Sequence, residues 1–429
     1  MRTFKRRSDG ATARGTKLLG SGGQGEVWFA HLEGKDVAIK VYHRHTATTA
    51  QFSVLERLVK AGPPARYFLW PLAIVDDEAT GTFGYVMELR EARFRTSEDF
   101  MARRVEPSFR ALLTAAWQLA DGFLQLHSQG LCYRDISFGN VFLDPNTGDI
   151  RICDNDNVDI SGSPTGGVLG TPRFMAPEVV RRGEGVPSDQ TDRYSLAVLL
   201  FYLLMGGHPL DGARESKIRC LDIPALEKLY GFDPLYIFDP IDVSNAPVRG
   251  IHDNPIAFQL VYPPAIRALF ERSFTEGLHY PNNRVRESEW RKAFFRARDS
   301  IQYCTECQTE NFYDAEALRS SGSQTCWSCQ HALTLPPRIR IGNDIVLLNH
   351  DTRLYAHHVG QVGGIEEAIA EVVRNPQNPG LFGLKNLTLE AWTITKPDGG
   401  IVDVPPGKAA PILQGNKINF GPATGEIRA

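Results

Sequence analysis

The sequence predicts an α+β protein in which a large mixed domain precedes a small cysteine-rich segment and a small β-sandwich. Three observations predict this class. Short β-type runs come first and are followed by amphipathic helical patterns that continue to about residue 299. Two closely spaced cysteine pairs lie within residues 300–335. From residue 336 to 429 the chain is β-rich, with turn signals such as Pro397-Asp-Gly-Gly.

The first domain is predicted to occupy residues 14–299, after a polar and basic stretch at residues 1–13 that we expect to be flexible. Its early part reads as β-strands around one helix, and its later part as helices separated by Pro-rich loops. A further helix is predicted at 364–373, inside the β-rich segment. The other predicted elements are strands at 17–19, 27–30, 36–42 and 81–89, and helices at 49–60 and 107–128.

Length, composition and charge exclude several classes of protein. A chain of 429 residues with 42% hydrophobic and 23% charged residues is ordinary globular material for two or three domains. The net charge of -3 gives no global attraction to nucleic acid or to an anionic membrane. No apolar run reaches the roughly 18 residues of a membrane-spanning helix, and the N-terminus lacks the apolar run of a signal peptide. We therefore expect a cytoplasmic protein with no membrane partner.

Two strings near the N-terminus suit the binding of phosphate groups. Gly20-Ser-Gly-Gly-Gln-Gly-Glu-Val27 places Gly20, Gly22 and Gly25 in a G-x-G-x-x-G pattern, which lets bare backbone N–H groups approach phosphate oxygens. Taken alone, it is as compatible with a plain glycine-rich hairpin. Lys40 follows in a β-type run, Val37-Ala-Ile-Lys40, and makes the phosphate interpretation much stronger.

Further strings carry the groups needed to transfer a phosphoryl group. Tyr133-Arg-Asp-Ile-Ser-Phe-Gly-Asn140 places Asp135 and Asn140 five residues apart, so that one turn can present both to one phosphoryl group. Asp154 ends a β-like run, where a carboxylate can bind a cation. The string Gly170-Thr-Pro-Arg-Phe-Met-Ala-Pro-Glu178 completes the set.

Four such strings in this order resemble those of eukaryotic-type (Hanks-type) Ser/Thr protein kinases over about residues 15–298. The resemblance implies a bilobal protein kinase-like fold, ATP and Mg²⁺ as cofactors, and a protein substrate. It makes Asp135 the catalytic base, and Asn140 and Asp154 the Mg²⁺ ligands. It has Lys40 hold the α- and β-phosphates while Glu56 holds Lys40, with a solvated helix glutamate as the alternative for Glu56. The residues that it places around the nucleotide are Gly20, Gly22, Gly25, Val27, Ala38, Lys40, Met87, Glu88 and Leu89.

The same resemblance assigns bracing roles outside the chemistry. Thr171 matches the threonine that marks Ser/Thr specificity. Glu178 is expected to be buried against Arg284, and Asp192 to brace the catalytic loop. Arg134 matches an arginine that often pairs with a phosphorylated loop residue, for which Ser161, Ser163 and Thr165 are candidates. A merely flexible Ser/Gly-rich loop explains those three residues equally well.

Three positions depart from the family pattern. Tyr133 replaces a histidine, which an aromatic ring can match in packing. Ser137 stands where a lysine usually contacts the γ-phosphate, so that a positive charge is missing. Asp154-Asn-Asp156 replaces Asp-Phe-Gly, and we expect the extra carboxylate of Asp156 to recruit a second cation or to favour Mn²⁺. The alternative to an active kinase is a pseudokinase scaffold that binds nucleotide and assembles partners.

The cysteine pairs predict a structural metal site. Cys304-x-x-Cys307 and Cys326-x-x-Cys329 can each form a tight turn that presents two thiolates, and two such turns close a tetrahedral Zn²⁺ site. Zinc ribbons also occur in nucleic-acid binders, but acidic residues outnumber basic ones in this segment. We therefore expect the Cys₄ zinc ribbon to dock a protein or act as a spacer, with nucleic acid an unlikely partner.

The last segment, residues 336–429, resembles a forkhead-associated domain in its final strands, Pro405 to Gly421. The resemblance implies a module that binds a phosphopeptide or a regulatory protein. The phosphothreonine-reading Gly-Arg turn and serine cannot be placed, and 351–358 is only suggestive, so a phosphate-blind interaction module is the alternative. The whole assembly resembles bacterial kinases of tellurite-resistance-type stress systems, which implies a signalling or stress-response role.

Overall fold

The computed structural model divides the chain into two compact units, and each is described here by itself. The first unit comprises Met1–Leu260 and Pro264–Lys292, and the second comprises Val261–Pro263 and Ala293–Ala429. One boundary, after Lys292, falls inside helix α10 (Glu287–Asp299), and another, after Leu260, falls inside helix α7 (Asp253–Val261). The structure describes residues 2–163, 170–181, 185–361, 363–364, 367–378 and 380–428.

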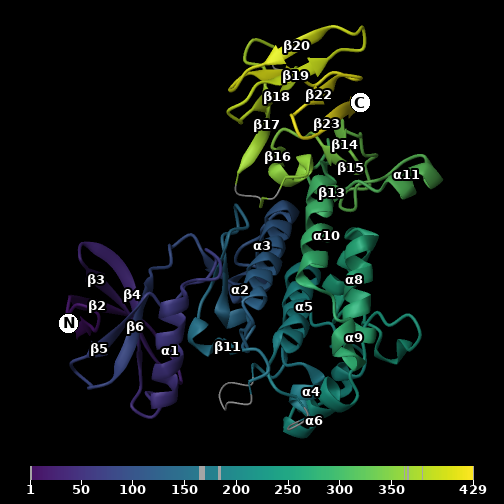
Figure 1. Ribbon diagram of the computed structural model, residues 1–429. Helices are drawn as coiled ribbons and strands as arrows, with labels where there is room; N and C mark the ends of the chain where they lie inside the picture. The colour runs from purple at the N-terminus through teal and green to yellow at the C-terminus, as the bar shows by residue number, and fades with distance from the viewer. Residues whose placement is uncertain are drawn as a thin grey trace. The chain divides into compact units, whose positions relative to one another are not determined.

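The first unit begins with six antiparallel strands that close into a barrel in the order β1-β2-β3-β4-β6-β5 (Figure 1). Apolar residues that alternate along these strands fill its interior, among them Ile39, Val41 and Val75, all almost fully buried. The strands are β1 (Arg2–Arg6), β2 (Thr12–Ser21), β3 (Gly25–Leu32), β4 (Lys35–Tyr42), β5 (Ala73–Asp77) and β6 (Phe83–Glu88).

The predicted flexible stretch at residues 1–13 is wrong, because Arg2–Arg6 forms strand β1 between β2 and β5. Phe4 is fully buried in the barrel core. Arg2 pairs with Asp77 of β5 at 2.6 Å. One apolar residue among basic neighbours gives a weak strand signal, yet the closed barrel supplies both hydrogen-bonding partners that the strand needs.

Helix α1 (Thr49–Ala61) lies beside the barrel, as the sequence predicted (Figure 1). Thr48 caps its N-terminus by accepting a hydrogen bond from the backbone N of Gln51. The helix buries Leu55 and Leu58, three residues apart on one face. Gly62 ends it with a φ of 73°, a conformation that favours glycine.

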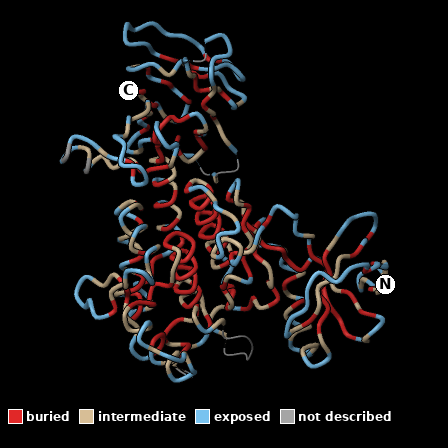
Figure 2. Tube along the Cα trace, turned by 180° about the vertical axis from the view of Figure 1, so that it is seen from behind, coloured by how far each residue is buried: buried red, intermediate tan, exposed pale blue. Residues whose placement is uncertain are grey.

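The second lobe of this unit is built on two buried helices, α3 (Phe109–Ser128) and α5 (Asp189–Met205) (Figure 2). Ser108 caps α3, and Ser188 with Thr191 forms a capping box at α5.

Among the described residues, no helix combines the length and the apolar character that crossing a membrane requires. The remaining elements are β7 (Arg95–Thr96), α2 (Ser97–Met101), β8 (Leu131–Cys132), β9 (Val141–Leu143), β10 (Ile150–Ile152), β11 (Asp159–Ile160), α4 (Pro177–Val180), α6 (Ile223–Glu227), α7 (Asp253–Val261), α8 (Pro264–Phe274) and α9 (Glu276–His279).

The second unit contains a short hairpin and two larger antiparallel sheets. One sheet has the order β15-β14-β23-β22-β19-β20 and the other β16-β17-β18-β21, and both contribute to one apolar cluster around Trp392, Leu354 and Leu384. The elements are β12 (Ile301–Tyr303), β13 (Glu310–Phe312), α11 (Ala315–Ser321), β14 (Arg338–Ile341), β15 (Asp344–Leu347), β16 (Arg353–Tyr355), β17 (Ala368–Arg374), β18 (Phe382–Asn386), β19 (Trp392–Thr395), β20 (Ile401–Val404), β21 (Ala409–Pro411), β22 (Lys417–Asn419) and β23 (Thr424–Arg428).

The helix predicted at 364–373 is wrong. Ala368–Arg374 is strand β17, which pairs with β16 on one side and β18 on the other. Its Ala and Glu residues favour a helix, but Ala370 and Val372 alternate into the buried core of the two sheets. Tertiary pairing therefore outweighs local propensity here, and residues 365 and 366 lie outside the described residues.

Candidate active site

The glycine-rich loop joins β2 to β3. A side chain at Gly25 would meet the carbonyl oxygen of Val41 at 2.1 Å, so close packing requires glycine there. Side chains at Gly20 and Gly22 would meet no heavy atom within 4 Å. The chain therefore leaves open space over these two glycines, and the backbone N–H of Gly22 donates within the loop to the carbonyl oxygen of Gly25 at 2.9 Å.

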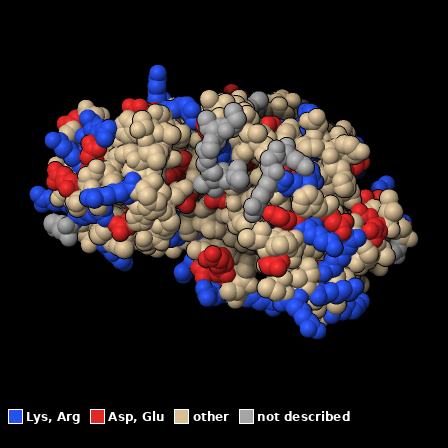
Figure 3. Space-filling view, turned by 90° about the horizontal axis from the view of Figure 1, so that it is seen from below, with Lys and Arg blue, Asp and Glu red and all other residues tan. Residues whose placement is uncertain are grey.

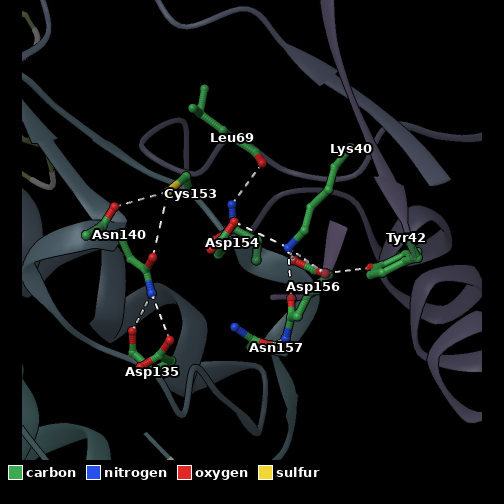
Figure 4. Close-up of polar contacts among 12 residues, drawn as sticks. Lys40, Tyr42, Leu69, Asp135, Asn140, Cys153, Asp154, Asp156 and Asn157 are labelled. Atoms are coloured by element: carbon green, nitrogen blue, oxygen red, sulfur yellow. Dashed lines mark hydrogen bonds and ion pairs between the residues drawn. The ribbon is translucent and has the colours of Figure 1, made fainter. Parts of the chain in front are cut away.

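Lys40 lies in the middle of β4 with its side chain 5% exposed. Its Nζ lies 2.9 Å from both carboxylate oxygens of Asp156, 3.4 Å from Oδ1 of Asp154 and 3.0 Å from Oε1 of Gln24 (Figure 4). Burial alone would lower the pKa of Lys40, but the charges of Asp156 and Asp154 raise it. The lysine is therefore held as a cation beneath the glycine-rich loop.

The predicted ion pair between Lys40 and Glu56 is not formed. Glu56 is exposed on α1, and its neighbours Leu55 and Leu58 are the residues that this helix buries. The lysine pairs with Asp154 and Asp156 instead. Counting residues along a helical pattern placed a carboxylate on the right helix but on its solvent face.

Asp156 is fully buried, and both of its carboxylate oxygens are engaged. Tyr42 donates to Oδ2 at 2.5 Å and Tyr85 donates to Oδ1 at 3.1 Å, in addition to the two contacts with Lys40. Burial alone would raise the pKa of Asp156, but Lys40 and the two tyrosine hydroxyls lower it. The expectation that Asp156 recruits a second cation is therefore wrong, because it already serves as the counter-ion of Lys40.

Asp154 follows β10 and is the accessible carboxylate of this group, with its side chain 41% exposed. Its backbone has φ 52° and ψ 39°, the left-handed region, which turns the chain sharply at the end of the strand. Burial raises the pKa of Asp154, Lys40 opposes that effect, and the nearby charge of Asp156 adds to it. A carboxylate in this setting gains from a cation, as a Mg²⁺ ligand would.

The catalytic loop brings the two predicted polar residues together. Nδ2 of Asn140 donates to the backbone oxygen of Asp135 at 2.8 Å and to its Oδ2 at 3.1 Å (Figure 4). Because the amide nitrogen faces Asp135, the amide oxygen of Asn140 points elsewhere, with the Cys153 thiol at 4.0 Å, a contact weak enough for a cation to replace. Thr171 Oγ1 donates to Oδ1 of Asp135 at 2.9 Å. The threonine of the Gly-Thr-Pro string therefore contacts the residue expected to act as base.

The predicted braces of this loop are formed. Asp192 of α5 accepts hydrogen bonds from the backbone nitrogens of Tyr133 and Arg134. Arg284 donates to both carboxylate oxygens of Glu178, at 2.7 and 2.8 Å. Such a bidentate pair fixes both distance and orientation.

An apolar group beside the glycine-rich loop matches the predicted adenine site. Ala38 and Met87 are buried and face each other across β4 and β6. Val27, Leu89 and Cys153 are partly buried and pack against the same cluster. Glu88 ends β6 and is exposed, so the strand leads directly into the segment predicted to bind the purine.

Sequence reasoning missed the polar residues that surround Asp156. Tyr42 lies two residues after Lys40 and therefore on the same face of β4, and Tyr85 of β6 pairs directly with Lys40. Gln51 of α1 donates to the hydroxyl of Tyr42 and to the backbone oxygen of Asp156. The strand period gave a signal for Tyr42, whereas the pairing of Tyr85 needed the register of the sheet.

Arg134 is occupied by a carboxylate from within the chain. Its Nη2 donates to Oδ2 of Asp159 at 2.7 Å. Of the three predicted phosphorylation sites, Ser161 exchanges hydrogen bonds with Asp189 at the start of α5. Ser163 has contacts of its own, and Thr165 lies outside the described residues.

The four paired cysteines come together in the second unit. The sulfur of Cys304 lies 3.6 Å from that of Cys329, and the sulfur of Cys307 lies 3.7 Å from that of Cys326. A tetrahedral site with Zn–S bonds of about 2.3 Å needs S···S separations of about 3.8 Å. The four thiols are therefore compatible with one zinc ion.

Both cysteine turns have the same backbone pattern. Gln308 and Gln330 each follow the second cysteine of a pair, with φ values of 60° and 62°. Their backbone nitrogens donate to the carbonyl oxygens of Cys304 and Cys326, respectively. The two turns thus present their thiols in matched geometry, as a ribbon of two knuckles requires.

Comparison with known proteins agrees with this geometry. The protein kinase domain matches residues 14–236. The chain belongs to the protein kinase family. It is 33% identical over 210 residues to the serine/threonine-protein kinase pkn2 of Myxococcus xanthus, an alignment that covers 45% of this chain and 24% of that protein. To the DNA damage-responsive serine/threonine-protein kinase RqkA of Deinococcus radiodurans it is 30% identical over 209 residues, 47% of this chain and 31% of that protein.

The similarity extends beyond bacteria. The chain is 31% identical over 215 residues to the protein kinase C delta type of Mus musculus, covering 47% of this chain and 30% of that protein. The matched region therefore spans only about a quarter to a third of the curated relatives' own length.

Proposed function

We propose that this protein transfers the γ-phosphoryl group of ATP to Ser or Thr residues of a protein substrate. The contact that carries the proposal is the one between Asn140 and Asp135, because it fixes a base and leaves an amide oxygen for Mg²⁺ beside Asp154. Membership of the protein kinase family supports the same reaction.

In the proposed reaction, each residue of the site has one task. The glycine-rich loop, which leaves open space at Gly20 and Gly22, and the cation of Lys40 bind the phosphates. Asp154 and Asn140 hold Mg²⁺, which neutralises developing charge when it is bound. Asp135 orients the substrate hydroxyl and accepts its proton. Thr171 positions that carboxylate through the hydrogen bond to Oδ1.

The test is transfer of labelled phosphate from ATP with Mg²⁺ or with Mn²⁺, comparing the native chain with Asp135→Asn. We expect transfer by the native protein and a loss of at least about 100-fold in the variant, since general base catalysis contributes 10²–10⁴-fold. If both proteins bind ATP and neither transfers phosphate, the chain is a pseudokinase scaffold. The missing cation at Ser137 would then be the first position to examine.

We also propose that the four cysteines hold a structural Zn²⁺ ion, supported by the S···S separations and the matched turns. Elemental analysis of the purified chain is expected to give one zinc per chain, and Cys326→Ser to lose it. A native protein without zinc would overturn the proposal.

On the face seen in Figure 3, basic and acidic side chains both occur, as expected for a chain of net charge -3 with a protein partner.

For the last segment we propose a forkhead-associated-like β-sandwich that binds a protein partner, within a cytoplasmic signalling kinase. The order of the two sheets supports a sandwich. Within the suggestive stretch 351–358, Nδ1 of His358 accepts from the backbone of Tyr355, and Nε2 donates to Asp299 at 3.0 Å. This histidine already has structural partners, which favours an interaction that does not read phosphate. A phosphothreonine peptide library that binds this segment would contradict that preference.

A further inference from the structure

Lys40 has its counter-ion on a different element from the one that protein kinases use. In the family, the strand lysine pairs with a glutamate of the neighbouring helix, and the position of that helix controls activity. Here Glu56 is exposed, and the lysine pairs with the third residue of Asp154-Asn-Asp156. We propose that Asp156 is the positioning residue that holds Lys40 for the nucleotide. The proposal rests on the proposed kinase activity.

The contacts of Asp156 are those of a fixed counter-ion. Lys40 reaches both carboxylate oxygens at 2.9 Å, and one tyrosine hydroxyl donates to each, from Tyr42 and Tyr85. A buried carboxylate with four such contacts has both of its oxygens satisfied. Such a geometry leaves Lys40 a single preferred position beneath the glycine-rich loop.

The turn that carries Asp156 is itself anchored. Asn155 is fully buried, and its Nδ2 donates to the backbone oxygens of Leu69 and Ile152 at 2.9 and 3.0 Å. Gln51 of α1 donates to the backbone oxygen of Asp156 at 3.1 Å. The metal ligand Asp154 and the lysine anchor are therefore parts of one fixed turn. Rotation of α1 would remove the Gln51 contact but would leave the Asn155 hydrogen bonds and the Lys40–Asp156 pair in place.

Removing the charge of Asp156 has a specific consequence. Lys40 would then keep only the carboxylate of Asp154, which lies 3.4 Å away and is needed for Mg²⁺. In the variant, Lys40 therefore holds the phosphates more weakly and competes with Mg²⁺ for Asp154. A displacement of this kind is expected to cost on the order of 100-fold in kcat/KM for ATP.

The experiment compares the full-length native chain with Asp156→Asn and with the matched control Glu56→Gln. Active sites are first titrated with a nucleotide analogue, so that each rate refers to folded protein. We expect Asp156→Asn to lose about 100-fold in kcat/KM for ATP with an unchanged KM for the protein substrate. The control is expected to stay within about twofold of native. A purely structural role would lower the titratable fraction and leave both KM values unchanged.

Two results would overturn the proposal: native kcat/KM in Asp156→Asn, or an equal loss in Glu56→Gln. A native chain that transfers no more phosphate than Asp135→Asn would instead contradict the proposed function. In that case, calorimetric titration with Mg²⁺ and a non-hydrolysable ATP analogue still tests the counter-ion. Binding at least about tenfold weaker in Asp156→Asn would support it, and equal binding would not.

A second observation concerns Arg134, and it stands apart from Asp156. Arg134 is almost fully buried, and Asp159 accepts from it with one carboxylate oxygen and from Arg57 of α1 with the other. In kinases, a phosphorylated loop residue makes such arginine contacts and orders the loop. We infer that Asp159 supplies this charge permanently, so that the start of the loop is anchored without phosphorylation. The main chain at Asp159 is also fixed by its pairing with Cys132.

The test measures initial transfer rates of protein that mass spectrometry shows to be unphosphorylated. We expect the native chain, Ser161→Ala and Ser163→Ala to transfer phosphate without a lag, and Asp159→Asn to lose this early transfer. A lag in the native chain that prior incubation with ATP removes would overturn the inference. A chain with no transfer above Asp135→Asn under any condition would point to the proposed function instead.

Discussion

Two buried charge clusters of the first unit contain similar groups but differ in exposure. In one, Lys40 pairs with Asp156 and Asp154, and the side chain of Asp154 is 41% exposed. In the other, the ring of His127 donates to Asp192 and Glu287 at 3.0 and 2.7 Å, and all three side chains are at most 4% exposed. The first cluster can accept a ligand, whereas the second has no exposed member.

The difference shows how a ligand-binding charge cluster can be distinguished from a purely structural one. The His127 cluster joins α3, α5 and α10, and Asp192 also accepts from the backbone of the catalytic loop. Its charges are satisfied by one another, by the backbone and by Arg193, whose Nε donates to Glu287 at 2.9 Å, so it holds the loop in place. The Lys40 cluster holds an accessible carboxylate beside open space over the glycines, so part of its charge is available to phosphate and metal.

The largest expected effect on stability comes from Asp192→Asn. The Asn side chain keeps one acceptor oxygen but turns an NH₂ group towards the remaining buried donors, and His127 loses one of its two carboxylate partners, which is expected to lower the free energy of unfolding by about 3 to 5 kcal/mol. Urea denaturation followed by intrinsic fluorescence measures the change. The control is Asp36→Asn. Asp36 forms an exposed ion pair with His31, so this variant should change the free energy of unfolding by less than about 0.5 kcal/mol. Equal effects would remove the distinction between buried and exposed charges.

A somewhat smaller effect is expected from pH. Burial would lower the pKa of His127, but hydrogen bonds to Asp192 and Glu287 raise it to about 9 from 6.5. Because the folded-state pKa is the higher one, the stabilisation is complete below about pH 6.5 and is lost as pH rises through about 9. Denaturation curves across that window should show a loss of about 3 kcal/mol in the native chain relative to His127→Gln. Parallel pH profiles in the two proteins would contradict the assignment.

The smallest effect is predicted for Tyr85→Phe in the Lys40 cluster. It removes one of four contacts to Asp156 and leaves the charge pair intact, so the free energy of unfolding should fall by only about 1 kcal/mol. The transfer rate is expected to stay within about fivefold of native. A loss as large as that of Asp156→Asn would mean that the hydrogen bonds to the carboxylate, and not its charge alone, position Lys40.

The sequence predicted those parts of the site that depend on local motifs. Lys40, Asp135, Asn140 and Asp154 lie together because short strings with fixed spacing place them on adjacent strands and turns. It did not predict the counter-ion, since the choice between Glu56 and Asp156 depends on which carboxylate is buried. Which carboxylate is buried depends on which face of α1 is buried, and a 13-residue helical pattern does not decide between two adjacent faces.

The same limit explains the errors in the fold. β1 and β17 are strands because each has a pairing partner on both sides, and neither has a strong local signal. Helices α1 and α3, by contrast, have capping residues and apolar faces that can be read locally. Long-range pairing is therefore what the sequence left open, both in the sheets and at Lys40.

The most direct test of the account is a crystal structure of the chain with Mg²⁺ and a non-hydrolysable ATP analogue. We predict that Nζ of Lys40 contacts the phosphates while it stays within hydrogen-bond distance of Asp156, and that Glu56 stays exposed on α1. A structure in which α1 has rotated, so that Glu56 replaces Asp156 at Lys40, would contradict the account.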